Sequence, residues 1–197
     1  MSRVPVLIVL AGGAATRLGS SKACCDLGGG LTPLDSLLAA GAVLRERALV
    51  IGAYTQTAPV GCEVIANPRW SSGRLSSVQA AVARFPGRDL LLAPVDVPLV
   101  PAGVFRALLE SWQAAAAPAF GWLAPQHAGS GRHGHPLLIG RGLLEGLHSA
   151  DPDRPLKDFR RLAQPCWSLP CHSAAVLDDL DTPEDLAALR ARRGFRL

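Results

Sequence analysis

The stretch that decides the fold is Val4-Pro5-Val6-Leu7-Ile8-Val9-Leu10-Ala11-Gly12-Gly13. A continuous apolar run that ends in glycines is typical of a strand buried on both faces of a parallel sheet, since an exposed face would bring alternating polar residues. The run is shorter than the roughly 18 apolar residues that cross a bilayer. Arg17 and Lys22 follow it closely, which argues against a signal peptide. We therefore expect a buried first strand at residues 4–10.

Strand-like and helix-like segments alternate along the rest of the chain. Further strands are expected at Ala48–Ala53, Cys62–Ala66, Asp89–Val95, Ala117–Leu123, Leu137–Ile139 and Ala174–Leu177. Helices are expected at Pro33–Arg47, Ser76–Phe85, Pro101–Ala116, Gly142–His148 and Leu156–Leu162, and a last one begins after Thr182 as N-cap. This alternation predicts an α/β fold with a mostly parallel central sheet covered on both faces. No linker divides the chain, so one domain over 1–197 is expected.

The composition excludes several classes of protein. Hydrophobic residues make up 49% and charged residues 18% of the 197 residues, which is typical of a folded chain and not of a disordered one. Five cysteines without a C-x-x-C pair indicate neither a disulfide framework nor a zinc site. We expect free thiols and a cytoplasmic location. Cys24 and Cys25 are interpreted as small packing residues.

The net charge of +4 comes from an unusual set of cations. Only two of the 20 basic residues are lysines, Lys22 and Lys157, and the remaining 18 are arginines. The arginines are scattered apart from a C-terminal group, and aromatic residues make up only 5%, so we expect no nucleic-acid partner. A mildly basic surface suits anionic small substrates. Lys157 lies in no motif and is expected to be solvated.

The loop from Leu10 to Lys22 is the first candidate site. Its small residues would let backbone N–H groups approach a phosphate chain, and Arg17 and Lys22 add positive charge. It matches neither the Walker A nor the G-x-G-x-x-G pattern, so P-loop hydrolases and dinucleotide dehydrogenases lose support. A flexible surface turn with incidental cations is the structural alternative. One of only two lysines lies here, which favours the phosphate site.

Three other loops bear candidate polar groups. Asp96 follows an apolar strand between two prolines, where it would be either an Mg²⁺ ligand or an ordinary strand-end residue. Asp181 precedes a helix, where it would be either a second metal ligand or an aid to the helix N-cap. The segment 131–136 would contact an anionic acceptor or form a hydrophilic turn. Each reading is open on the residues alone.

Five segments occur in the order of one family's motifs. The chain resembles the nucleoside-triphosphate transferases of the molybdenum cofactor group, especially the molybdenum cofactor cytidylyltransferases. The matching segments are Leu10 to Lys22 (L-A-[AG]-G-x-x-x-R-[ML]-G-x-x-K), Asn67 to Ser77 (N-P-x-W-x-x-G-x-x-S-S), Pro94 to Val100 (P-x-D-x-P-x-[VL]), Gly134-His135-Pro136 (G-H-P) and Asp179 to Asp185 (D-[LI]-D-T-P-E-D).

The resemblance implies a three-layer, Rossmann-like nucleotidyltransferase fold with Mg²⁺ as cofactor. It implies transfer of a nucleoside monophosphate from an NTP, with CTP favoured over GTP, to a phosphorylated acceptor. Molybdopterin is the favoured acceptor, and a molybdoenzyme or its chaperone is a further partner that the resemblance suggests. A sugar-1-phosphate or another metabolite as acceptor, and a catalytically idle nucleotide-binding module, are the alternatives.

The resemblance also implies roles for residues at matching positions. The catalytic residues would be Arg17, Lys22 and Asp96, and the acceptor would contact Ser77 and His135. Mg²⁺ would contact Asp96 and Asp181, with Asp179 as an alternative to Asp181. The nucleotide would contact Leu10, Ala11, Gly12, Gly13, Arg17, Lys22, Asn67 and Ser76. Two departures bear on this. The G-K-P-L lysine of many members is missing from Gly28–Leu34, and L-A-G-G is the opening favoured by guanylyl enzymes.

Overall fold

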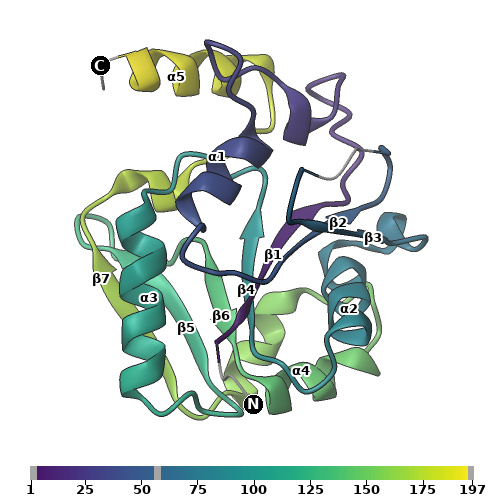
Figure 1. Cartoon of the computed structure of the whole chain (residues 1–197), viewed down its shortest axis with the longest axis vertical. Coiled ribbons are helices and arrows are strands. Elements are labelled where there is room, and N and C mark those ends of the chain that lie inside the picture. Colours follow the sequence, from purple (N-terminus) through teal and green to yellow (C-terminus); the bar gives the residue numbers. More distant parts are fainter. Residues whose placement is uncertain (1–3, 56–58, 195–197) are drawn as a thin grey trace.

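A computed structural model describes residues 4–55 and 59–194 of the chain. In this part of the chain the strands form one seven-stranded sheet in the order β3-β2-β1-β4-β6-β5-β7. The strands are β1 (Val6–Ala11), β2 (Arg47–Ile51), β3 (Glu63–Ala66), β4 (Leu90–Pro94), β5 (Trp122–His127), β6 (Leu137–Ile139) and β7 (Cys166–Cys171). Figure 1 shows β1 and β4 at the centre of the molecule, with helices on either side of the sheet.

The first strand is buried as its sequence predicts. All six residues of β1 are buried, and they alternate between the two faces of the sheet. β1 pairs in parallel with both β2 and β4, and β2 pairs in parallel with β3. Parallel strands in the middle of a sheet need apolar residues on both faces, which accounts for the unbroken apolar run.

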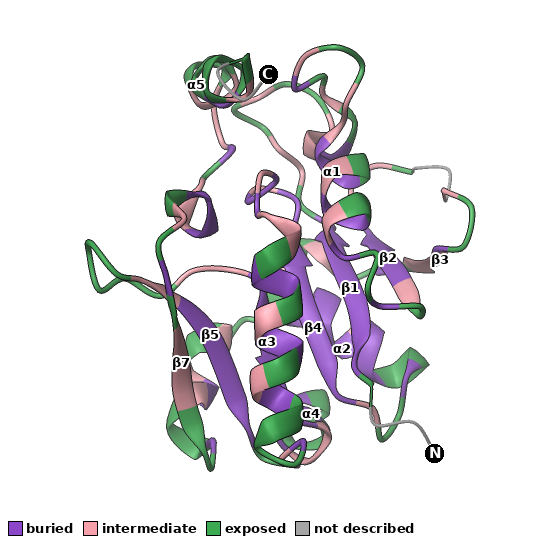
Figure 2. Ribbon diagram, turned by 60° about the vertical axis from the view of Figure 1, so that its left-hand side comes forward, coloured by how far each residue is buried: buried purple, intermediate pink, exposed green. Residues whose placement is uncertain are grey.

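Helices cover both faces and complete three layers. One face packs against α1 (Pro33–Ala40) and α3 (Ala102–Ala114), and the other against α2 (Arg74–Arg84) and α4 (Arg141–His148). In Figure 2 the central strands are buried, and α3 has both buried and exposed residues along its length. The predicted α/β, three-layer, Rossmann-like fold with a mostly parallel sheet is confirmed; β6 is the exception, being antiparallel to both β4 and β5.

Two assignments near the C-terminus were wrong. Ala174–Leu177 is a short 3-10 helix, η4, and not a strand; a four-residue apolar run has no periodicity that separates the two. The seventh strand is β7 (Cys166–Cys171), which no expected element covered. Its sequence contains Pro170 and is only partly buried, as an edge strand allows, so it lacks an apolar signature.

Two elements are displaced from their predicted limits. The first helix ends at Ala40 rather than near Arg47, with Gly41 as its C-cap. A Cβ at Gly41 would lie 2.5 Å from Leu7 Cδ2, so the close packing on β1 favours glycine there. The fifth strand begins at Trp122 rather than Ala117, because Ala116 and Ala117 adopt positive φ in a turn. The predicted short helix over Leu156–Leu162 is a 3-10 helix, η3.

The last helix, α5 (Pro183–Gly194), lies at the edge of the sheet where β1 and β4 end (Figure 1). Thr182 caps it as predicted, since Thr182 Oγ1 accepts a hydrogen bond of 3.2 Å from Asp185 N. Leu189 of α5 packs with Leu27 and Leu180 in a small separate cluster. No helix within the described ranges has the length and apolar character needed to span a membrane.

Candidate nucleotide-binding site

A cavity of about 380 Å³ opens at the carboxyl ends of β1 and β4. The two strands are adjacent and in parallel register, with Leu10 opposite Pro94, so the loops that follow them lie side by side. This is the edge at which ligands bind in doubly wound sheets. The cavity is lined by Leu10, Ala11, Gly12, Gly13, Ala15, Thr16, Arg17, Lys22, Ala23, Trp70, Gly73, Arg74, Ser77, Pro94, Val95, Asp96 and Asp181.

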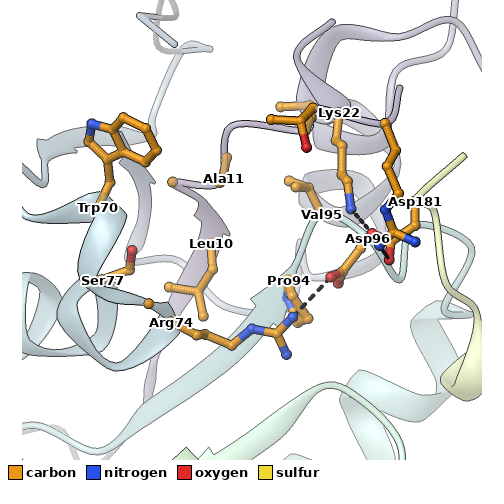
Figure 3. A pocket seen from close by; sticks show the side chains of 17 residues that line it. Leu10, Ala11, Lys22, Trp70, Arg74, Ser77, Pro94, Val95, Asp96 and Asp181 are labelled. Carbon is orange, nitrogen blue, oxygen red and sulfur yellow. Dashed lines mark hydrogen bonds and ion pairs between the residues drawn. The ribbon is translucent and has the colours of Figure 1, made fainter. Parts of the chain in front are cut away.

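Small residues bring the backbone of the first loop close to α2. A Cβ built on Gly12 would lie 2.7 Å from Ser77 Oγ, so only glycine fits here without displacing Ser77. Trp70 lies beside this contact and packs tightly on Gly52. Figure 3 shows Trp70 and Ser77 on one side of the cavity and Lys22 and Asp181 on the other. A nucleotide in the cavity would thus have an aromatic wall on one side and cations on the other.

The two predicted phosphate-binding cations both contact one carboxylate. Lys22 Nζ pairs with Asp181 Oδ1, and an Arg17 guanidinium nitrogen pairs with Asp181 Oδ2. Lys22 begins the short 3-10 helix η1 (Lys22–Cys24), which aims its side chain into the cavity. The Lys22 side chain is 17% exposed and that of Arg17 is 65% exposed. The more enclosed lysine is therefore the stronger electrostatic partner of the two.

A hydrogen bond from its backbone N–H holds Asp181 in place, in addition to the two cations. Its backbone N–H donates a 3.0 Å hydrogen bond to Asp185 Oδ2, which also accepts from Thr182 N at 2.8 Å. The two backbone N–H groups lower the pKa of Asp185. The hydrogen bond from Lys22 lowers the pKa of Asp181, and the nearby Arg17 charge acts in the same direction. Asp181 lines the cavity and supports the start of α5 through its backbone N–H, and its role as a metal ligand stays a prediction.

A pH titration tests the Lys22–Asp181 pair. Because the folded pKa of Asp181 lies below its ordinary 3.8, the pair contributes stability above about pH 4 and loses it as the pH falls through the folded value. In Lys22→Ala we expect the Asp181 carboxyl to titrate at a higher pH than in the wild type, measured by carbon-detected NMR. An unchanged Asp181 titration in this variant would show that the Lys22–Asp181 pair does not stabilise the folded protein.

Asp96 also lines the cavity and pairs with a cation that is not among the predicted site residues. Arg74 Nη2 lies 3.0 Å from Asp96 Oδ2, and the dashed line in Figure 3 joins them. Arg74 begins α2, although the positive end of the helix dipole disfavours a cation at that position. A cation at a helix N-terminus inside a motif could have signalled a function. With Arg17 and Lys22, Arg74 gives the cavity three cations.

The residues fit a divalent cation shared with a substrate. Asp96 Oδ1 is buried and has no hydrogen-bond partner, so it presents an unsatisfied anionic oxygen. Within residues 4–55 and 59–194, no group of three or more His, Cys, Asp or Glu side chains could hold a metal alone. Mg²⁺ characteristically needs only one or two carboxylates when phosphates supply other ligands. Asp96 is available, and Asp181 would have to exchange its cation partners.

Asp179 is the alternative carboxylate. Burial raises its pKa, and the negative charges of Asp181 and Asp96 add to this shift. These couplings place Asp179 near the other two acids, but its side chain does not line the cavity. Asp181 therefore has the better position of the two for a metal held with a phosphate chain.

Three predicted site residues lie outside the lining of this cavity. Asn67 and Ser76 are buried behind it: Asn67 Nδ2 donates to Ser76 Oγ at 2.8 Å and to Ser77 Oγ at 3.1 Å. Asn67 thereby orients Ser77, which does line the cavity, although it was assigned to the acceptor. His135 lies in a neighbouring cavity that shares Arg74 with this one. Direct nucleotide contacts by Asn67 and Ser76 stay predictions.

The glycine-rich segment 28–30 has no lysine but is not without cations. Arg193 of α5 donates to the Gly28 carbonyl, and Arg190 Nε donates to Asp26 O at 2.8 Å. Neither arginine lines the nucleotide cavity, so they hold the loop rather than replace the missing lysine there. Nearby, burial raises the pKa of Cys25, whose thiol donates to Lys22 O. This fits a packing role for Cys25.

Comparison with known proteins identifies the family. Residues 7–168 match the MobA-like NTP transferase domain, which is well over half of the chain. The chain belongs to this family. The match runs from β1 into β7, so it includes Arg17, Lys22, Arg74 and Asp96 but ends before Asp181. This MobA-like chain is therefore a nucleotidyltransferase domain by family. Comparison with curated protein sequences gives no significant match.

Solved structures share the fold over almost the entire length. The Rv0371c protein of Mycobacterium tuberculosis H37Rv superposes with a TM-score of 0.77 at 22% identity, covering 97% of this chain and 100% of that one. The molybdopterin-guanine dinucleotide biosynthesis protein A of Archaeoglobus fulgidus gives 0.72 at 18% identity, covering 96% and 99%. The 2-C-methyl-D-erythritol 4-phosphate cytidylyltransferase of Thermus thermophilus gives 0.66 at 18% identity, covering 95% and 98%. At these identities the likeness supports the fold of the MobA-like domain.

Proposed function

We propose that this MobA-like domain transfers a nucleoside monophosphate from an NTP to a phosphorylated acceptor and releases pyrophosphate. Magnesium is the proposed cofactor, CTP the favoured nucleotide with GTP as the alternative, and molybdopterin the favoured acceptor. The observation that carries the proposal is the convergence of Lys22, Arg17 and Arg74 with Asp96 and Asp181 at the ends of β1 and β4. A structure of the mycobacterial Rv0371c protein in complex with manganese, similar to this chain at 20% identity, supports a divalent cation.

The cations of the site would act on substrate phosphates, Lys22 and Arg17 on the NTP and Arg74 where the NTP meets the acceptor. In the free protein each pairs with a carboxylate, Lys22 and Arg17 with Asp181 and Arg74 with Asp96. The substrate phosphates would displace these carboxylates from the cations, because phosphate oxygens make strong charge-assisted hydrogen bonds. The freed carboxylates of Asp96 and Asp181 would then hold Mg²⁺, which when bound supplies charge neutralisation for the phosphates.

The reaction needs no proton acceptor from the protein. An oxygen of the acceptor phosphate attacks the α-phosphorus of the NTP. The bond between the α-phosphorus and the oxygen that bridges the α- and β-phosphates breaks, and pyrophosphate leaves in line with the attacking oxygen. The second pKa of a phosphomonoester is about 6, so the attacking group is already largely ionised near neutral pH. The protein would contribute positioning and stabilisation of developing negative charge through Lys22 and Arg17.

The proposed choice of base and of acceptor rests on sequence motifs alone. The segments N-P-x-W, G-H-P and D-T-P-E-D favour a cytidylyl enzyme, whereas L-A-G-G favours a guanylyl enzyme. Trp70 offers the cavity a face on which either base could stack. An idle binding module loses support, because the cavity contains three cations despite the missing lysine.

A panel of NTPs tests the proposal. The full chain is incubated with Mg²⁺ and each of CTP, GTP, ATP and UTP, with and without molybdopterin, and pyrophosphate release is measured. We expect release only with acceptor present, fastest with CTP. Release with GTP but not with CTP, in the presence of acceptor, would identify guanine as the base and would still support nucleotidyl transfer. No release with any NTP would contradict the proposed function.

A further inference from the structure

A second cavity of about 420 Å³ lies next to the nucleotide site, between β5, β6 and the 3-10 helix η3. Arg74 lines both cavities, so the second one adjoins the Asp96 side of the first. Its lining comprises Arg74, Trp122, Ala124, His133, Gly134, His135, Leu137, Pro155, Leu156, Lys157 and Arg160. No acidic side chain is among them. The cavity is thus electropositive, with an apolar wall formed by residues such as Trp122 and Leu137.

The polar groups of the second cavity form two sets. Arg74 and His135 make up the first, at the junction with the nucleotide cavity. His135 Nδ1 is buried and has no hydrogen-bond partner, and its backbone is fixed because His135 N donates to Val176 O at 2.9 Å. Burial and the Arg74 charge lower the pKa of His135 to about 4, so the ring is neutral at physiological pH. An unsatisfied, neutral ring nitrogen is a group that a bound ligand would satisfy.

The second set belongs to η3 and the loop before β6. Arg160 Nη2 donates to His133 Nε2 at 3.2 Å, and Ser168 Oγ lies 2.7 Å from the same nitrogen. Since arginine has only donors, Nε2 accepts, and burial with the Arg160 charge lowers the pKa of His133. Arg160 Nε points to Cys166 Sγ at 3.3 Å. The guanidinium is therefore held in place with other N–H groups free for a ligand, and Lys157 adds an exposed cation.

We propose that this second cavity is the acceptor site and that it binds a second anionic group of the acceptor besides the reactive phosphate. Its reactive phosphate would lie at Arg74 and His135, and a second anionic group would lie at Arg160 and Lys157. The part of the acceptor between the two anionic groups would pack against Trp122 and Leu137. This inference rests on the proposed function for the identity of the ligand as acceptor. It gives Lys157, the lysine outside every motif, a specific role.

Matched small molecules test the two-ended site. The probes are 4-carboxyphenyl phosphate, which has an anion at each end of a benzene ring, and phenyl phosphate, which lacks the second anion. Binding is measured by calorimetry with the full chain saturated with Mg²⁺ and CTP, so that the nucleotide cavity is occupied. We expect the two-ended probe to bind about tenfold more tightly, the contribution of roughly one charge-assisted hydrogen bond.

Variants assign the preference to its residues. Lys157→Glu and Arg160→Gln should each reduce the preference for the carboxylate severalfold and leave phenyl phosphate affinity unchanged. Arg161→Ala, an exposed arginine of the same segment that does not line the cavity, should keep it. Lys157 is exposed and makes no ion pair in the described part of the chain, so Lys157→Glu should fold even if Arg160→Gln does not.

The outcomes separate this inference from the proposed function. Equal binding of the two probes, an equal loss in Arg161→Ala, or displacement of either probe by raising the CTP concentration would overturn the inference. Discrimination between the probes by a chain that shows no nucleotidyl transfer would support the two-ended site and contradict the proposed function. Transfer without any discrimination would support the function and overturn the inference.

Discussion

Replacing Lys22 with alanine should lower the rate of nucleotidyl transfer by at least ~10²-fold, the effect expected when one well-placed charge contact to a transition state is removed. Lys22 is the most enclosed cation of the cavity and is aimed at Asp181 by η1. Its ammonium is a compact charge that suits a phosphate chain, so Lys22→Arg should not restore full activity. The measurement is pyrophosphate release at saturating NTP and acceptor.

Arg161→Ala is the matched control, since it removes the same charge from an exposed site outside the cavity. It should keep wild-type turnover. If Lys22→Ala also keeps it, the phosphates do not bind at the Lys22 loop and the site assignment is wrong.

Replacing Asp96 with asparagine should cost ~10²–10³-fold in turnover and weaken the response to Mg²⁺. The change removes the negative charge while keeping the size of a side chain whose Oδ1 is buried without a partner. It also leaves Arg74 without its 3.0 Å carboxylate partner. A magnesium titration of activity measures both effects, because a lost ligand raises the half-saturating metal concentration as well as lowering the maximal rate.

Glu110→Gln on the exposed face of α3 is the control for this charge change and should leave the magnesium response unaltered. An Asp96→Asn variant with the wild-type magnesium response would remove Asp96 from the metal site. Asp181→Asn would then be the next variant to titrate.

The elements that could be predicted are those whose sequence signal is local. The apolar run of β1, the strand before Asp96 and the Thr182 cap each follow from periodicity or from a capping residue. The meeting of Lys22 and Asp96 follows from topology, because parallel neighbouring strands end at one edge. Asp181 was placed in the cavity by its motif, although its pairing with both Arg17 and Lys22 was not foreseen.

The features that escaped prediction depend on contacts distant in sequence. β7 is an edge strand containing proline, so its pattern has no strand signature. Arg74 contributes to the site only because α2 directs it to Asp96 beyond the end of β4, a contact that no local pattern encodes. The second cavity joins η3 to β5 and β6, which is why Lys157 looked like an ordinary solvated lysine.

The most direct measurement of nucleotidyl transfer follows two labels on the NTP. The full chain is incubated with Mg²⁺, molybdopterin and CTP labelled with ³²P at either the α- or the γ-phosphate, and products are separated. We predict that the α-label appears in the acceptor and the γ-label in pyrophosphate, with neither product formed by Asp96→Asn beyond about one hundredth of the wild-type rate. Appearance of the γ-label in the acceptor, or its release as inorganic phosphate, would contradict nucleotidyl transfer.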